Sequence, residues 1–223
     1  MLKEQTLKVT ARRAAIIVIA LGAAVAAQAN VITYNMAFPL SGVGTGTQMD
    51  TTSLLKFNPS LGTLTSATIT YFDYAFSESS ITNLTAKKRF ESQSSFASDK
   101  IKVSTGGLIS VVGSISASTS QSGPLLGGVT NDLVDAHFGG GSSTFTSMLD
   151  LAEFTGLGTL MVTNNTTTSG SAFGQGSYSA FTNNFAEAQA SVTYDYKSVP
   201  SPAAAATMLI GVVGGIARRR RLA

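Results

Sequence analysis

Residues 186–197 alternate between apolar and polar side chains, and this pattern constrains the fold more than any other stretch of the chain. One side of the alternation carries Ala188, Ala190, Val192, Tyr194 and Tyr196. The positions between them hold Gln189, Ser191, Thr193, Asp195 and Lys197. A repeat of two residues is the period of a β-strand with one buried face. The stretch therefore predicts a strand in a sheet that packs one face against a second layer.

Further runs have the composition of strands, and turn-forming stretches separate them. The strand-like runs are rich in threonine, β-branched and aromatic residues: 62–76, 108–117 and 158–163. The stretches that we interpret as turns are rich in glycine, asparagine and serine: 41–47, 123–128, 138–143 and 164–177. This order predicts an all-β fold, an antiparallel β-sandwich of jelly-roll type. We expect one short helix, at Asp132–Ala136 or at Met148–Phe154. An outer-membrane β-barrel is the alternative, but the chain of a barrel would end on a strand.

The first 29 residues predict a signal peptide, with a signal helix ahead of the sandwich. Its basic region contains Lys3, Lys8, Arg12 and Arg13, and residues 14–26 are apolar. Ala27 and Ala29 fit the small-x-small rule for signal peptidase, so we place cleavage between Ala29 and Asn30. An uncleaved N-terminal anchor is the alternative, which the short apolar run disfavours.

The last 25 residues contain three elements in a fixed order. The first consists of Val199, Pro200, Ser201 and Pro202. An apolar run, 203–217, follows, and the last element is the block Arg218, Arg219, Arg220 and Arg221. As a hydrophobic helix the apolar run would span about 22 Å, less than the roughly 30 Å of a membrane core. Arginines at its end would stay at the cytoplasmic surface. An ordinary single-span C-terminal anchor is one interpretation.

The same three elements resemble the PEP-CTERM sorting signal of Gram-negative bacteria. Proteins with that signal are processed near the Pro-Glu-Pro element by a membrane-embedded exosortase. Ser201 stands where the glutamate of that element would be. The resemblance implies transient residence in the inner membrane, followed by release to the cell surface or extracellular matrix.

The basic charge of the chain lies mostly in these two terminal segments. The whole chain has a net charge of +3, and eight of its 15 Lys and Arg residues lie in residues 1–29 or 218–221. Residues 30–200 hold seven basic and eleven acidic residues, a net charge of −4. This acidic body argues against nucleic acid as a partner. The chain has no cysteine, so disulfides, thiol catalysis and cysteine-ligated zinc are excluded.

A second resemblance covers the body of the chain. Phe57-Asn58-Pro59-Ser60-Leu61-Gly62-Thr63-Leu64 resembles the opening motif of the choice-of-anchor E domain, an exported bacterial family. Residues 151–160 and 190–196 resemble its later segments in the same order. The resemblance implies a location and no enzymatic activity. It divides the chain into a signal peptide (1–29), a sandwich domain (30–198) and a sorting or anchor segment (199–223).

The opening motif also has a structural interpretation. Pro59 and Gly62 are typical of a tight turn, so we expect Phe57, Leu61 and Leu64 to pack in the core around it. Gly156 and Gly158 predict a bend at the start of a strand.

Residues with catalytic or metal-binding chemistry are few. A metal site is conceivable at Asn131, Asp132, Asp135 and His137, but a solvated loop with a helix N-cap is the preferred interpretation. No pair is selected for glycosidase chemistry among Asp73, Glu78, Glu91, Asp99, Asp150 and Glu153. We therefore assign no catalytic residue, no cofactor and no metal ligand.

The sequence predicts an exported cell-surface or matrix protein with a structural or interaction role. The first alternative is a carbohydrate-binding module for exopolysaccharide, and a secreted hydrolase is a more distant one. Aromatic residues that could stack on sugar rings are Tyr71, Phe72, Tyr74, Tyr178, Phe181, Tyr194 and Tyr196.

Overall fold

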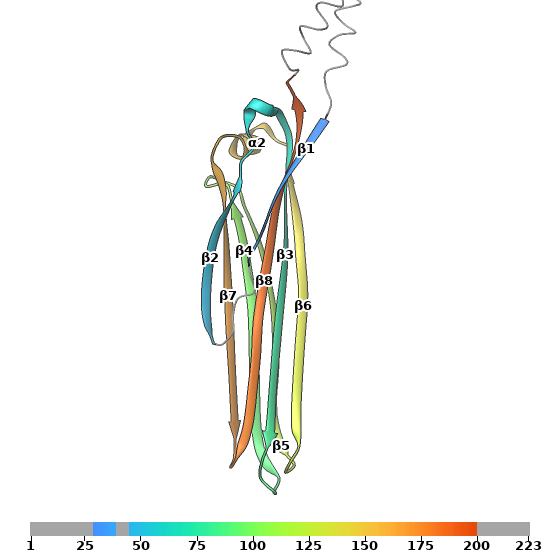
Figure 1. Cartoon of the computed structure of the whole chain (residues 1–223), viewed down its shortest axis with the longest axis vertical. Coiled ribbons are helices and arrows are strands. Elements are labelled where there is room, and N and C mark those ends of the chain that lie inside the picture. The colour runs from blue at the N-terminus through green and yellow to red at the C-terminus, as the bar shows by residue number, and fades with distance from the viewer. Residues whose placement is uncertain (1–28, 39–44, 200–223) are drawn as a thin grey trace, which may run out of the picture.

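The body of the chain forms two antiparallel β-sheets that face each other. The computed structural model describes residues 29–38 and 45–199. Sheet A has the strand order β1-β8-β3-β6, and sheet B has the order β2-β7-β4-β5 (Figure 1). The predicted antiparallel two-sheet architecture is therefore confirmed. No helix in these described ranges is long and apolar enough to cross a membrane.

The strands are long, so the body is an elongated rod (Figure 1). In sheet A the strands are β1 (Ala29–Ala37), β8 (Tyr178–Ser198), β3 (Gly62–Asn83) and β6 (Thr130–Phe145). In sheet B they are β2 (Gly46–Leu55), β7 (Thr159–Gly174), β4 (Arg89–Ser104) and β5 (Ser110–Leu125). At about 3.4 Å per residue, the 22 residues of β3 extend for roughly 70 Å.

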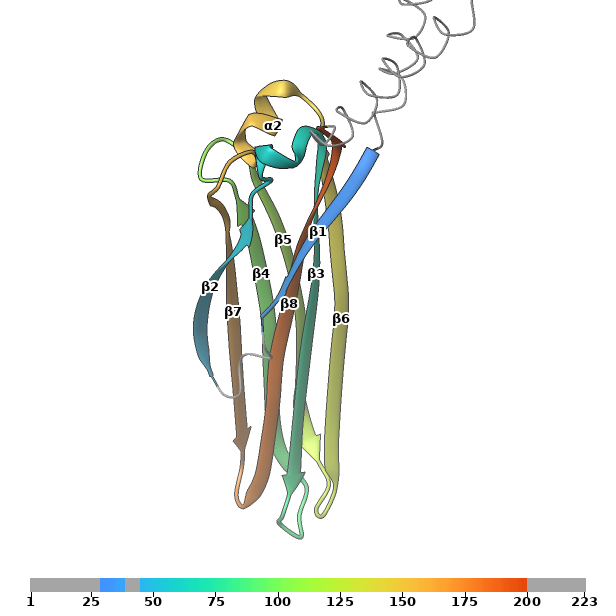
Figure 2. The same ribbon diagram turned by 45° about the horizontal axis from the view of Figure 1, so that its top comes forward.

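The two ends of the rod differ. One end carries the 3-10 helix η1 (Pro59–Leu61) and the helix α2 (Met148–Phe154), and we call it the α2 end (Figure 2). Both β1 and β8 reach this end, where Ala29 is the Cα partner of Lys197. The opposite end, which we call the far end, consists of the turns that join β3 to β4, β5 to β6 and β7 to β8 (Figure 1).

The apolar core lies near the α2 end. Phe57, Phe154 and Tyr194 are almost fully buried there, and the Tyr194 ring contacts each of the two phenylalanine rings edge to face. Leu64 joins this core as predicted, whereas Leu61 is 38% exposed and the prediction for it is wrong. The reason is that Leu61 closes η1 at the rod's end, where no layer covers it. Near the middle of the rod, a second cluster of buried apolar residues consists of small side chains: Ala75, Ala97, Ala117 and Ala186.

Two glycine-rich stretches that predict turns are strands. Residues 138–143 lie within β6, and residues 164–174 within β7. The glycines serve close packing: a Cβ at Gly141 would lie 2.7 Å from the Tyr71 hydroxyl, and one at Gly170 would lie 2.7 Å from the Thr182 hydroxyl. Glycine in a strand often marks such a close approach.

The expected short helix forms at the second of its two predicted positions. The helix α2 covers Met148–Phe154, with Ser147 as its N-cap. Residues 132–136 belong to β6, so neither a helix nor a solvated loop with an N-cap forms there. That stretch pairs with β3 along its whole length, and the backbone groups that point toward β3 are hydrogen-bonded in the sheet instead of in a helix.

Candidate functional site

The outer face of sheet A carries a cluster of five aromatic side chains, which we call the aromatic patch. Alternate residues of β3 point outward from the sandwich, and β6 and β8 flank them. The members of the patch are Phe72, Tyr74, Phe76, Phe138 and Phe185. Phe138 is 70% exposed and Phe72 is 38% exposed. An exposed apolar cluster of this kind marks a contact surface in soluble proteins.

The rings of the aromatic patch stack on one another across the strands. Tyr74 stacks on Phe138 with ring centroids 4.5 Å apart, and Phe76 stacks on Phe185 at 4.7 Å. Both are cross-strand pairs, because Tyr74 is the register partner of Phe138 and Phe76 that of Phe185. Stacked rings cover part of each other's faces, so the patch turns ring edges as well as faces to solvent.

The other predicted aromatic residues do not join the patch. Tyr194 is buried and its hydroxyl donates to the Leu55 carbonyl oxygen at 3.0 Å. Its pKa is raised by burial and by neighbouring Tyr34. Tyr71 and Tyr196 pack against the apolar core. Tyr178 and Phe181 lie at the β8 end nearest the far end, apart from the five stacked rings.

Two carboxylates face the interior near the middle of the rod. Asp73 of β3 and Asp99 of β4 are each 1% exposed. Burial raises the pKa of Asp73 to about 7, and the charge of Asp99 adds to the shift. Burial also raises the pKa of Asp99, while hydrogen bonds from Thr166 and Asn164 oppose the shift. One oxygen of each carboxyl group, Asp73 Oδ1 and Asp99 Oδ2, has no hydrogen-bond partner.

The interior beyond these carboxylates is polar. The Ser77 hydroxyl contacts the Ser95 hydroxyl at 2.6 Å and donates to Asn184 Oδ1 at 3.0 Å. Thr119 contacts both Ser79 and Ser95 through its hydroxyl. Such a hydrogen-bonded interior stabilises one specific alignment of the two sheets, because an unpaired buried hydroxyl is costly.

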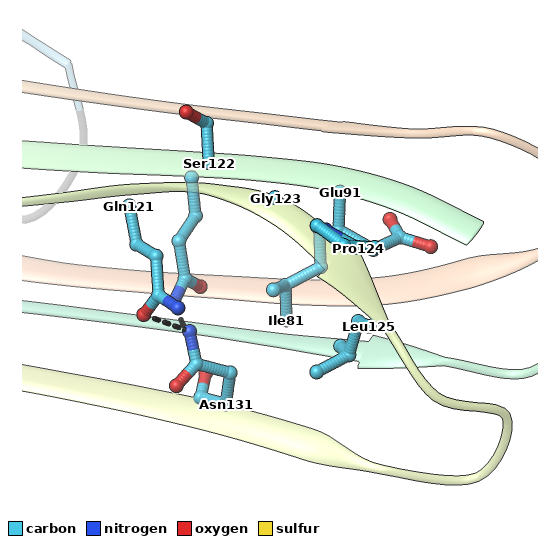
Figure 3. Close-up of a pocket in the computed structure, with 9 residues that line it drawn as sticks. Ile81, Glu91, Gln121, Ser122, Gly123, Pro124, Leu125 and Asn131 are labelled. Atoms are coloured by element: carbon cyan, nitrogen blue, oxygen red, sulfur yellow. Dashed lines mark hydrogen bonds between the residues drawn. The ribbon is translucent and has the colours of Figure 1, made fainter. Parts of the chain in front are cut away.

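A pocket of about 190 Å³ lies between the sheets toward the far end (Figure 3). Asn131 donates to Gln121 across its mouth, and Ile81 and Leu125 supply apolar walls. Glu91 also lines it, but in Figure 3 its carboxylate points away from Gln121 and Asn131. A Cβ at Gly174 would lie 2.1 Å from Glu91 Oε2, so the carboxylate lies beside β7. The pocket thus lacks a charged group aimed into it.

The remaining candidate carboxylates have structural surroundings. Glu153 of α2 accepts hydrogen bonds from the Thr105 hydroxyl, from Leu108 N at 2.9 Å and from Ile109 N at 3.3 Å. These bonds, together with Lys56, lower the pKa of Glu153. Asp150 interacts with the N-cap Ser147. None of these carboxylates forms an exposed acidic pair that would select a hydrolase.

The residues considered for a metal site lie on both faces of β6. Asp135 Oδ1 lies 3.0 Å from His137 Nε2, and Asp135 Oδ2 accepts a hydrogen bond from Ser118 N of β5. Asp132 is three residues before Asp135 in the strand, so it points to the opposite face. Within residues 29–38 and 45–199, no three His, Asp or Glu side chains group closely enough to hold a metal ion.

The described structure covers only part of the predicted processing sites. Ala29 and Asn30 begin β1, and Val199 follows β8 with its N–H donating to the Leu61 carbonyl oxygen at 3.4 Å. Ala27, the residues Pro200, Ser201 and Pro202, and the block Arg218–Arg221 lie outside the described residues. The predictions for the signal peptide and the sorting motif therefore stay predictions.

Comparisons with known proteins assign no family. No protein-family model matches the chain, and no curated protein matches it. A structure of Desmodium yellow mottle tymovirus shares 12% identity over 78% of this chain and 92% of that chain, with a TM-score of 0.24. A structure of the infectious bursal disease virus Gx strain shares 13% identity over 87% of this chain and 49% of that chain, with a TM-score of 0.20. A crystal structure of the Cry23Aa1 and Cry37Aa1 binary protein complex shares 11% identity over 79% of this chain and 92% of that chain, with a TM-score of 0.24. At these TM-scores the likenesses carry no argument about function.

Proposed function

We propose that the chain is an exported protein of the cell surface or extracellular matrix with a structural or interaction role. The observation that carries the proposal is the pair of terminal sequence signals, small-x-small at Ala27–Ala29 and the Val-Pro-Ser-Pro, apolar and arginine series at 199–221. The resemblances to the choice-of-anchor E domain and to PEP-CTERM tails point the same way. Signal peptidase and an exosortase-like enzyme are the processing partners that this proposal requires.

The geometry of the body is compatible with processing at both ends. Ala29 and Lys197 are Cα partners, so the described residues next to the two proposed cleavage points lie side by side at the α2 end of the rod. A chain held by its C-terminal segment in the inner membrane would carry the α2 end toward the membrane. The far end and the aromatic patch would then be presented outward, where partners can reach them.

We infer a jelly-roll-like connection of the strands within this body. In the orders β1-β8-β3-β6 and β2-β7-β4-β5, successive strands lie in opposite sheets, except β4 and β5, which are neighbours in sheet B. Double-sheet jelly rolls distribute eight strands in this way. We also propose that a signal helix and a hydrophobic helix flank the body before processing.

The mass of the secreted product tests the export proposal. The full chain is expressed in a host with an exosortase and in the same host lacking it, and the product is analysed by intact mass spectrometry. We expect the product to begin at Asn30 in both hosts. It should lack Arg218–Arg221 only in the host that has the exosortase. A variant with Arg218–Arg221 replaced by serine serves as a matched control that should not be processed. Retention of the arginines in both hosts would contradict sorting by cleavage and restore a plain anchor.

Carbohydrate binding is a second candidate function, favoured by the exposure of Phe72 and Phe138. Exopolysaccharide is the proposed partner, held by rings on the open face of sheet A. A pull-down of the full chain on exopolysaccharide tests it, with Phe138→Ala as the variant and Phe173→Ala, exposed on β7, as the control. Equal retention of both variants would reject the patch as a sugar site.

A further inference from the structure

The β8 edge of sheet A is covered along only half of its length. β1 pairs with β8 from Gln189 to Lys197, and Phe38 N donates to the Ala188 carbonyl oxygen at 2.8 Å. Between Tyr178 and Ala186, β8 pairs with β3 on one side. In the described part of the chain no segment pairs with its other side. This stretch, which we call the free β8 edge, presents unpaired backbone groups.

The free β8 edge lacks the features that normally prevent strands from pairing. Residues 178–186 contain no charged residue and no proline, and their register with β3 is unbroken. The opposite side of the rod is protected in two ways. Pro124 lies within β5 and has no N–H to donate, and Asp135 Oδ2 accepts from Ser118 N at 2.8 Å.

The neighbouring edge in sheet B is partly satisfied from within the chain. β2 covers β7 from Thr159 to Thr168. Beyond that point, Asn184 Nδ2 donates to the Ser169 carbonyl oxygen at 2.9 Å, and the Tyr178 hydroxyl contacts the Ala172 carbonyl oxygen at 3.5 Å. On this side of the rod, the backbone groups available for pairing with another strand are therefore mainly those of β8.

We propose that two copies of the chain associate through their free β8 edges in antiparallel orientation. Such pairing is self-complementary and closes with two-fold symmetry, so it forms a dimer and stops there. It joins the two copies of sheet A into one continuous sheet. The occupant of the edge is thus a second copy of this chain.

The side chains of β8 define the register of this pairing. Odd-numbered residues such as Phe181 and Phe185 lie on the outer face, whereas Asn184 and Ala186 are buried inside. Pairing must keep outer residues opposite outer residues, because a slip by one residue exchanges the faces. The register that places Phe181 opposite Phe185 of the second copy satisfies this rule and forms two cross-strand aromatic pairs. It puts Asn183 on the two-fold axis.

The side chains of β7 next to this edge leave room for the second copy. The residues of β7 at the level of Thr182 are small, Gly170, Ser171 and Ala172, and they line a shallow pocket of about 150 Å³ together with Ala180–Thr182 of β8. No long side chain of β7 therefore protrudes past the β8 edge at the axis. The second copy's sheet can approach β8 without displacing sheet B.

A single introduced cysteine tests the register directly, because the chain has none of its own. In the proposed dimer, Asn183→Cys places two Cα atoms directly opposite, about 4.5–5.5 Å apart, within the range of a disulfide. We expect the full chain, exported to an oxidising compartment, to run mainly as a disulfide-linked dimer on a non-reducing gel. Thr144→Cys is the matched control, since it lies exposed on the same outer face at the β6 edge, and it should remain monomeric. Equal cross-linking of the two variants, or none in either, would overturn the proposal.

A charge placed on the edge gives an independent test. Phe181→Lys puts a lysine on the free β8 edge, whereas Phe138→Lys puts one on the same sheet face away from it. Sedimentation velocity of the full chain in mild detergent should show a dimer for the wild type and for Phe138→Lys. Phe181→Lys should be monomeric at the same concentration, with a dissociation constant raised at least tenfold. Unchanged association of Phe181→Lys, with a wild-type circular dichroism spectrum, would reject the edge as the interface.

Discussion

Thr65 of β3 is an extra residue opposite Asp195 of β8, and its hydroxyl donates to the Asp195 carbonyl oxygen at 2.9 Å. The register passes from Leu64 opposite Tyr196 directly to Ser66 opposite Asp195, which defines a β-bulge. Ser66 also donates to the Asp195 carboxylate. Because of the bulge, Leu64 and Ala67 both face the core although they differ in parity. With this change of parity, the side chains of Phe72, Tyr74 and Phe76 point to the outer face.

Deleting Thr65 should destabilise the α2 end. The long pairing of β3 with β6 and β8 holds residues 67–83 in place, so the one-residue slip falls on Gly62–Leu64 and turns Leu64 out of the core. We expect a loss of about 3–5 kcal/mol in the free energy of unfolding, comparable with the loss of a large buried side chain. Urea denaturation followed by circular dichroism measures it. Thr65→Ala keeps the bulge and loses one hydrogen bond, so it should cost only about 1 kcal/mol. Equal effects of the two changes would contradict the role of the bulge.

The stability of the protein should fall as the pH rises from 4 to 7. Burial raises the pKa of Asp73 to about 7 from 3.8, so the folded state binds a proton more tightly than the unfolded state. The associated stability is fully present below pH 3.8 and is lost as the pH rises through about 7; Asp99, whose pKa is also raised, acts in the same direction. For Asp73 the linked change is up to about 4 kcal/mol.

Thermal unfolding between pH 4 and 8 measures this dependence. Asp73→Asn removes the titrating group and keeps the shape, so its melting temperature should vary less over this range. Asp50→Asn is the control, because Asp50 is not among the fully buried residues. A wild-type melting temperature that rises between pH 4 and 7 would show that the two interior carboxyl groups do not govern the pH dependence.

Phe57 should be far more important for stability than Leu61, although both belong to the same turn motif. Phe57 is 1% exposed and contacts the rings of Tyr194 and Tyr196 at 5.8 and 5.2 Å, whereas Leu61 is 38% exposed. We expect Phe57→Ala to cost about 3–5 kcal/mol, because it leaves a cavity in the core. Leu61→Ala should cost less than about 1 kcal/mol. Comparable urea midpoints for the two variants would be inconsistent with this core.

Glu153→Gln should loosen the loop between β4 and β5. The Glu153 carboxylate receives the Thr105 hydroxyl and the N–H groups of Leu108 and Ile109, so it holds the loop against α2. An amide accepts such hydrogen bonds more weakly than a carboxylate. Hydrogen exchange should accelerate several-fold at residues 105–109 with little change in β4. Glu78→Gln, on the outer face of β3, is the control and should leave exchange in this loop unchanged.

Sequence patterns identified the strands whose inner residues are apolar. The alternation at 186–197 predicts the inner face of β8 correctly, because Ala188, Ala190, Val192 and Tyr194 are all buried. The turn at Asn58–Gly62 and the helix at Met148–Phe154 are also local features, set by capping and by proline and glycine. β4 shows no such pattern, since Glu91, Gln93, Ser95 and Asp99 line its inner face.

By itself the sequence determined which segments form strands with an apolar face and where the tight turn near Pro59 lies, because side-chain period and turn chemistry are local. Tertiary structure decided which face of residues 66–83 is buried. That run carries apolar and polar residues on both faces, and only the bulge at Thr65 and pairing with β6 and β8 put Asp73 and Ala75 inside and Phe72 and Tyr74 outside. Packing of sheet A on sheet B brings together Asp73 and Asp99, so that the charge of Asp99 acts on Asp73. Contacts between distant strands, which no local pattern encodes, therefore create both the aromatic patch and the acidic interior.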